Sequence, residues 1–239
     1  MSAQAVAAAA AFLQARLGEP IGWEDAAAHV GYSPFHFSRM FARRTAMSPG
    51  RYLAVLRFHA AKRLLLAADD DVVDVCTAVG FASHATFTRR FAAVVGTPPA
   101  RFRRLADALA ERSTQPFAIG ASTGPAVRVS LRLPERGLRR PWHVWLGWYP
   151  EPVPIGLPTA GVLVEGDDDV ELPLCPGAPH LLGFAVDPTA EALAQLAPDA
   201  PLVSGWPRPL RAPAAVTLRF AAPPRPAVPL LSALPSLAP

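Results

Sequence analysis

Lysine, cysteine and long hydrophobic segments are scarce in this sequence. The chain of 239 residues holds two cysteines, Cys76 and Cys175, and a single lysine, Lys62, among its 23 cationic residues. Two cysteines far apart in the chain provide neither a disulfide framework nor a C-x-x-C metal pair, which fits a reducing compartment. No stretch of about 18 apolar residues occurs, so we expect no membrane-spanning helix.

The signature of a signal peptide is also missing. The apolar opening from Ala3 to Leu13 has no basic start and no cleavage pattern, and residues 14–16 continue it as an amphipathic helix. We therefore expect a cytoplasmic protein, and no residue pattern indicates a cofactor.

Proline is rare in the first part of the chain and frequent in the second. Residues 1–112 contain 5 of the 28 prolines, and residues 113–239 contain the other 23. Because proline breaks helices, the second part is not a helical bundle. Fourteen cationic and nine acidic side chains give the first part a net charge of +5, against −1 for the second. We predict a helical domain over 1–112 and a β-rich domain with a proline-rich tail over 113–239. The basic excess suits a DNA-binding surface, although an ordinary solvated surface is the alternative.

A repeat with a spacing of 50 residues lies within the first part. Residues Phe37–Phe41 match Phe87–Phe91, and the match continues to Pro49 with Pro99. The alternative is that two unrelated amphipathic helices in an alanine-rich protein share a Phe-x3-Phe spacing by chance. The agreement of the capping and stop signals favours a structural repeat instead.

Each copy has the pattern of a helix, a tight turn and a second, exposed helix. Ser33 and Ser83 are typical N-caps, and Gly96 suits the end of a helix where φ is positive. Such a pair of helices is a DNA-reading unit, with the second helix in the major groove. About seven helices are expected in all, over residues 3–17, 23–30, 34–45, 49–68, 72–79, 83–95 and 98–111.

The first part resembles the double helix-turn-helix DNA-binding domain of AraC/XylS-type transcription regulators. The resemblance covers roughly residues 1–110. Ile21–Arg57 resembles the first half of the domain, and the second half is matched at Gly80, Phe81, Phe87, Arg89, Phe91, Gly96, Pro99 and Arg103. Two departures are visible. Ala46 stands where the family usually has glycine after the first recognition helix, and Cys76 stands where it usually has alanine.

The resemblance implies a transcription regulator rather than an enzyme. It implies double-stranded promoter or operator DNA as the partner, with RNA polymerase, a small-molecule effector and a second copy of the chain as further candidates. It places Arg39 and Arg89 at base edges, where arginine pairs with guanine O6 and N7; a phosphate or solvent role is the alternative. The other expected base contacts are Phe35, Ser38, His84, Ala85 and Thr88. The expected phosphate contacts are Arg43, Arg44, Arg90, Arg101, Arg103 and Arg104.

One long helix is expected between the two reading units, from Pro49 to about Ala68. Twenty residues span roughly 30 Å, close to the ~34 Å between successive major-groove faces of B-DNA. The helix thus suits two units over adjacent turns, or it serves only as core. The three aspartates at 69–71 are expected to end it and to place a carboxylate near the next helix. A metal site is the alternative, but adjacent side chains in a turn do not converge.

The second domain is predicted as an antiparallel β-sandwich-like fold. Strands are expected over residues 127–133, 142–149, 159–164, 170–174, 180–186 and 215–220, with a helical turn at 191–196. From Pro223 the chain is expected to be irregular, with Leu230 and Leu231 docked on the sheet.

Aromatic residues and one cysteine make further candidate sites in the second domain. A possible effector pocket comprises Trp142, Trp145, Trp148, Tyr149 and Trp206; a subunit interface and plain core filling are the alternatives. Cys175, His143 and His180 permit a thiol or metal site to be drawn, but zinc usually needs four ligands, and a buried strand cysteine is simpler. The competing function is a small-molecule-binding or catalytic protein whose helical half only assembles it.

Overall fold

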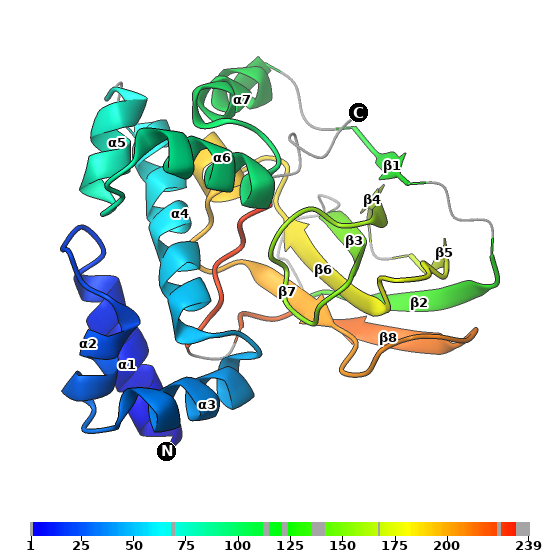
Figure 1. The fold of residues 1–239 in the computed structure, drawn as a ribbon. Helices are drawn as coiled ribbons and strands as arrows, with labels where there is room; N and C mark the ends of the chain where they lie inside the picture. Colours follow the sequence, from blue (N-terminus) through cyan, green and yellow to red (C-terminus); the bar gives the residue numbers. More distant parts are fainter. Residues whose placement is uncertain are drawn as a thin grey trace.

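The structure, a computed structural model, describes residues 2–67, 70–111, 115–120, 124–134, 142–166, 168–223 and 226–232. Helices form one half of the molecule and two sheets form the other half beside it (Figure 1). The helices of the first half are α1 (Ala3–Ala15), α2 (Trp23–His29), α3 (Pro34–Thr45), α4 (Pro49–Ala67), α5 (Val72–Ala78), α6 (His84–Val95) and α7 (Pro99–Glu111). They confirm the helices predicted for the first part, with ends that shift by one or two residues. The predicted domain boundary at residues 112 and 113 lies outside the described residues.

The aspartates after α4 meet their expectation only in part. Asp71 occupies the N-cap position of α5, which places its carboxylate near that helix, but its side chain makes no capping hydrogen bond. Asp69 lies outside the described residues. Within the part of the chain that the structure describes, no three His, Cys, Asp or Glu side chains are grouped as metal ligands. In the same residues, no helix has the length and apolar character needed to cross a membrane.

Helix α4 belongs to two hydrophobic clusters at once. Tyr52, Leu53 and Leu56 pack in a first cluster with residues of α1, α2 and α3. Val55 and Phe58 pack in a second cluster with residues of α5, α6 and α7. The repeated helices therefore form two units that share α4 as a common wall (Figure 1).

The two units meet where the turn before α6 reaches the loop after α1. Gly80 has φ +79°, and a Cβ atom there would lie 2.6 Å from the Leu17 carbonyl oxygen and 2.9 Å from Arg57 Nη2. Both the positive φ and the close approach require glycine. Arg57 reinforces the junction by donating to the carbonyls of Leu17, Glu19 and Ile21.

The second half contains two sheets. Its elements are β1 (Phe117–Ile119), β2 (Ala126–Arg132), β3 (His143–Tyr149), β4 (Ala160–Glu165), β5 (Val170–Pro173), β6 (His180–Val186), α8 (Ala192–Leu196), β7 (Leu202–Gly205) and β8 (Ala215–Arg219). One sheet has the order β1-β4-β3-β6-β7, and the other has the order β5-β2-β8. The predicted β-rich fold with antiparallel sheets is confirmed, except that β2 and β8 pair in parallel. The strand predictions missed β1 and β7.

Both faces of the larger sheet are covered. On one face, Leu146 and Trp148 share a core with Val129 of the smaller sheet. On the other face, Trp145 packs in a cluster with Leu230, which comes from the last described segment of the chain.

That last segment, residues 226–232 (the tail segment), lies against the helical half. The Tyr52 hydroxyl donates to the Ala227 carbonyl at 3.0 Å. The Nζ of Lys62, which is completely buried, donates to the carbonyls of Leu230 and Leu231 at 3.1 and 3.0 Å. Leu230 belongs to the cluster on the sheet, as expected, whereas Leu231 packs into the cluster of the second helical unit.

Candidate nucleic-acid interface

Helices α3 and α6 are anchored by the same three positions of the repeat. The buried residues of α3 are Phe37, Phe41 and Thr45, and those of α6 lie 50 positions later, at Phe87, Phe91 and Val95. The i, i+4 spacing puts each set on one side of its helix, so the opposite side is available to solvent. The same local rule therefore sets which face each helix exposes.

The two helices also begin and end alike. Ser33 Oγ accepts a hydrogen bond from the His36 amide at 3.4 Å, and Ser83 Oγ accepts one from the Thr86 amide at 3.3 Å. Both helices close on a left-handed residue, Ala46 with φ 58° and Gly96 with φ 97°. Alanine in place of glycine thus keeps the same helix end, at the cost of strain, because a Cβ disfavours this backbone region.

The residues of α3 that were predicted to contact bases are largely exposed. Phe35 and Arg39 are exposed and Ser38 is half-buried, and the Arg39 guanidinium lies 5.5 Å from the centre of the Phe35 ring. Phe35 is 73% exposed.

The matching face of α6 is smaller and more polar. His84, Ala85 and Arg89 are exposed, and Thr88 is half-buried with its hydroxyl 3.4 Å from His84 Nε2. Arg39 and Arg89 thus occupy equivalent exposed positions on the two helices.

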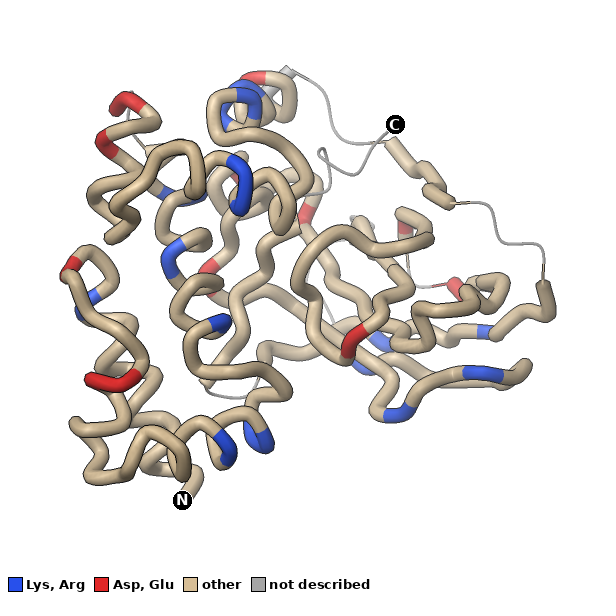
Figure 2. Tube along the Cα trace, in the orientation of Figure 1, with Lys and Arg blue, Asp and Glu red and all other residues tan. Residues whose placement is uncertain are grey.

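Five of the six arginines predicted to contact phosphates are exposed. They lie on α3, α6 and α7, where Figure 2 shows cationic positions, and they are Arg43, Arg44, Arg90, Arg101 and Arg104. Arg103 is half-buried, unlike the other five. Its guanidinium donates to the carbonyls of Leu65 and Asp70 and so ties α7 to the end of α4. The physical reason is helix geometry, because position 103 of α7 faces α4 whereas positions 101 and 104 face solvent.

The aromatic residues predicted to form one effector pocket are divided between different parts of the β-rich half. Trp145 and Trp148 are both buried, but they belong to clusters on opposite faces of the larger sheet. Trp206 packs against the core between the two sheets. Strand alternation places Trp145 and Trp148 on opposite faces, whereas the half-buried Trp142 and Trp206 pack in the same cluster as Trp148.

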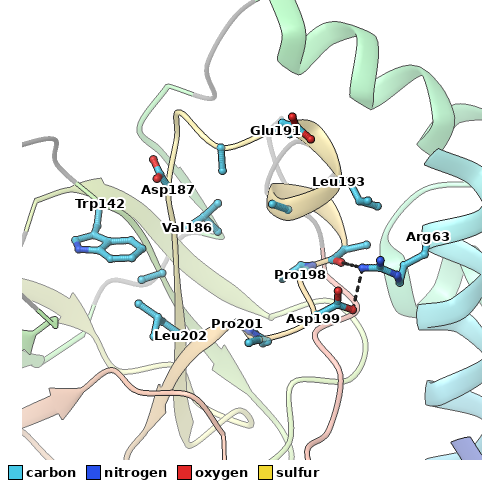
Figure 3. Close-up of a pocket in the computed structure, with 15 residues that line it drawn as sticks. Arg63, Trp142, Val186, Asp187, Glu191, Leu193, Pro198, Asp199, Pro201 and Leu202 are labelled. Atoms are coloured by element: carbon cyan, nitrogen blue, oxygen red, sulfur yellow. Dashed lines mark hydrogen bonds and ion pairs between the residues drawn. The ribbon is translucent and has the colours of Figure 1, made fainter. Parts of the chain in front are cut away.

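Trp142 lines a cavity of about 410 Å³ beside α4. Figure 3 shows its indole across the cavity from Arg63, whose guanidinium binds the Asp199 carboxylate at 2.9 Å and the Ala197 carbonyl at 3.2 Å. Tyr149 lines a different cavity, which lies against the end of α3.

The cysteine and histidine candidates lie on different segments of the β-rich half or, for Cys76, on α5. Both cysteines are free, and burial raises the pKa of each thiol, which disfavours the reactive thiolate. His143 is buried with its Nε2 3.3 Å from the Glu165 carboxylate. His180 is half-buried on β6, and the described segments group none of these side chains into a set of three metal ligands.

Two residues with clear structural roles were not predicted from the sequence. Lys62 fixes the tail segment on α4, and Arg57 ties α4 to the loop after α1. The only signal for Lys62 was its uniqueness, as the one lysine in an arginine-rich chain. Nothing local distinguished Arg57.

Comparison with known families identifies the helical half. Residues 26–105 match the family described as "Helix-turn-helix domain". The helical half is therefore similar to the helix-turn-helix part of transcriptional regulators. The match runs from α2 to the middle of α7 and therefore includes both repeated helices.

Curated relatives agree with this assignment. The chain is 33% identical to an uncharacterised helix-turn-helix-type transcriptional regulator, YobQ of Bacillus subtilis, over 40% of each chain. It is 28% identical to the transcriptional regulator Rob of Salmonella typhimurium, over 67% of this chain and 64% of Rob. The matched part thus spans less than two thirds of the length of these relatives.

Among solved structures, the DNA-binding domain of AdpA in complex with a target DNA is 30% identical. That similarity covers 43% of this chain and 93% of the AdpA domain, with a TM-score of 0.42.

Proposed function

We propose that this protein is a sequence-specific DNA-binding transcription regulator in which α3 and α6 read two adjacent segments of the major groove. The observation that supports this most is the equivalence of Arg39 and Arg89 on two exposed helix faces with matched caps and matched buried anchors. Helix α4, at 19 residues, is about 28 Å long, which is close to the ~34 Å of one helical turn of B-DNA.

In this proposal the two arginines read bases and the neighbouring arginines bind phosphates. Arg39 and Arg89 pair with guanine, with Ser38, Thr88 and His84 as further hydrogen-bonding groups. Phe35 and Ala85 contact thymine methyl groups. Arg43, Arg44, Arg90, Arg101 and Arg104 position the helices through phosphates without reading sequence. Arg103 is not assigned a phosphate contact in this proposal, since its Nε and Nη2 donate to carbonyls within the domain.

We further propose a division at residues 112 and 113 into a reader and a regulatory domain. The β-rich domain regulates the reader through a ligand or through self-association, and RNA polymerase is the partner of the bound complex. Support for the regulatory role comes from direct contacts: Ile155 and Val228 of the β-rich part pack against the clusters of both helical units. Catalysis is not part of the proposal.

The assignment of the arginines is tested by fluorescence anisotropy on a selected duplex and on random DNA. Arg39→Ala and Arg89→Ala should each weaken binding to the selected duplex by about 1–3 kcal/mol and leave binding to random DNA nearly unchanged. Equal losses on both DNAs would contradict the base-reading role.

Arg43→Ala and Arg104→Ala are the matched controls for charge. Each removes one cation from the same helical half, so each should weaken all sequences alike and reduce the dependence of binding on salt.

A further inference from the structure

The cavity lined by Tyr149 lies between the β-rich domain and the end of the first recognition helix. It has a volume of about 350 Å³. This volume falls within the range of about 300–1,000 Å³ typical of small-molecule sites. Residues 44–46 at the end of α3 form one side, Leu182 and Phe184 of β6 form another, and Val228 and Leu230 of the tail segment form a third.

The lining of this cavity is mainly apolar, with one charged side chain among its described residues. Prolines, valines, leucines and Phe184 supply most of the surface, and Arg44 is the charged residue. Arg44 is exposed and lies in the last turn of α3. A cavity with this lining favours an apolar ligand, and the guanidinium favours one that ends in an anionic group.

Tyr149 also lines the cavity. The residue is 1% exposed, and Trp145 and Ser232 are the hydrogen-bonding neighbours of its hydroxyl. Burial raises the pKa of Tyr149 to about 12, and hydrogen bonds with the side chains of Trp145 and Ser232 oppose part of this rise. The phenol thus stays neutral and remains a hydrogen-bond donor.

We propose that this cavity binds a small apolar molecule with one anionic group, such as an alkyl or aryl carboxylate, whose anionic end pairs with Arg44. The ligand chain lies between β6 and the tail segment. The site itself requires no DNA, but the regulatory consequence rests on the proposed function.

The consequence follows from the place of Ala46. This residue lines the cavity and holds the end of α3 in a left-handed conformation with φ 58°. A bound ligand contacts residues 44–46 and the β-rich domain together, so it stabilises one position of α3 relative to that domain. Ligand and DNA then influence each other's affinity, and by linkage the effect is reciprocal.

Calorimetry with three probes of equal chain length tests the site in the purified full chain. Octanoate, octan-1-ol and octylammonium share their apolar part and differ in charge. Octanoate should bind saturably with one site and most tightly, and octylammonium should bind most weakly. Absence of saturable binding by all three at millimolar concentration, or tighter binding of octylammonium than of octanoate, would overturn the proposal.

Two neighbouring arginines provide a matched pair of variants. Arg44→Ala should weaken octanoate about fivefold, the effect of one partly exposed ion pair, and should leave octan-1-ol unchanged. Arg43→Ala removes the same charge from the preceding residue, which does not line the cavity, and should leave octanoate binding as it was. Equal effects of the two substitutions on octanoate binding would show that Arg44 does not contact the ligand.

Two leucines test the apolar part in the same way. Leu182 lines this cavity and Leu202 lines the one beside α4, and both are half-buried. Leu182→Trp fills the proposed site and should abolish octanoate binding, whereas Leu202→Trp should not. Thermal unfolding of both variants shows whether they fold. If Leu182→Trp does not fold, the comparison of Arg44→Ala with Arg43→Ala still tests the site. Binding of octanoate to both tryptophan variants alike would place the probe elsewhere.

The coupling is read from DNA affinity with and without octanoate. A shift in wild-type affinity that Arg44→Ala abolishes would support regulation through this site. Saturable octanoate binding by a protein that prefers no DNA sequence would support the ligand site and contradict the proposed function. If the protein prefers a DNA sequence but octanoate does not change its affinity for that sequence, only the coupling between ligand and DNA is contradicted.

Discussion

The two helical units have the same local construction but different attachments to the β-rich domain. The first unit is attached through Val153, the hydrogen bond from Tyr52 to the Ala227 carbonyl and an exposed ion pair between Arg51 and Glu151. A cavity lies between the end of α3 and the sheet. The second unit is attached by deeper burial, with Leu196 of α8 and Leu231 of the tail segment inside its cluster. This difference fits a second unit that is fixed and a first unit that responds to a ligand.

The largest expected effect tests whether the two units are packed equally. Phe37 and Phe87 are fully buried at equivalent positions, so Phe37→Ala and Phe87→Ala should each lower the free energy of unfolding by about 3–5 kcal/mol. Urea unfolding monitored by circular dichroism gives both values. A loss below about 1 kcal/mol for either would show that its unit lacks the packed core described above.

Phe35 provides the control for this pair. It lies two residues from Phe37 but is exposed, so Phe35→Ala should change stability by no more than about 0.5 kcal/mol. In the proposed function it should nevertheless weaken DNA binding.

The next effect concerns the buried attachment of the second unit. Burial lowers the pKa of Lys62 to about 7 from its ordinary value of 10.5. Between these values the unfolded chain binds a proton that the folded chain has released, so stability should rise with pH by up to about 1.4 kcal/mol per unit. His59, its titratable neighbour on α4, has a pKa lowered to about 4 by burial and does not titrate in this window.

Unfolding measured from about pH 7 to about pH 10, in wild type and in Lys62→Met, isolates this contribution. The variant should lack the rise, whereas Arg51→Ala, at the exposed attachment of the first unit, should keep it. A rise of the same size in Lys62→Met would mean that Lys62 is not the group responsible.

The smallest expected change in stability comes from substitutions at the two helix ends. Ala46 bears strain that Gly96 avoids, so Ala46→Gly should stabilise the protein and Gly96→Ala should destabilise it, each by about 1 kcal/mol. Differential scanning calorimetry gives the direction. Destabilisation by Ala46→Gly would indicate that the cavity contacts of its methyl group outweigh the backbone strain.

The helical half was predictable because its signals are local. Ser33 and Ser83 cap helices, and the phenylalanines at i and i+4 define the buried sides, within segments of about a dozen residues. The exposed positions of Arg39 and Arg89 follow directly from those anchors.

The remaining features depend on contacts between distant segments. Trp145 is buried because the tail segment, far later in the chain, covers its face of the sheet with Leu230. The parallel pairing of β2 with β8 and the short strands β1 and β7 are likewise set by their partners and not by local alternation. The role of Arg103 depends on where α4 ends, which its own segment does not reveal.

The central claim, that two equivalent units read DNA side by side, is tested most directly by selecting bound sites from a random duplex pool. The account predicts an enriched sequence with two conserved blocks about 10 base pairs apart, one of which loses its preference in Arg39→Ala and the other in Arg89→Ala. No enrichment, or a single block affected by both substitutions, would contradict it.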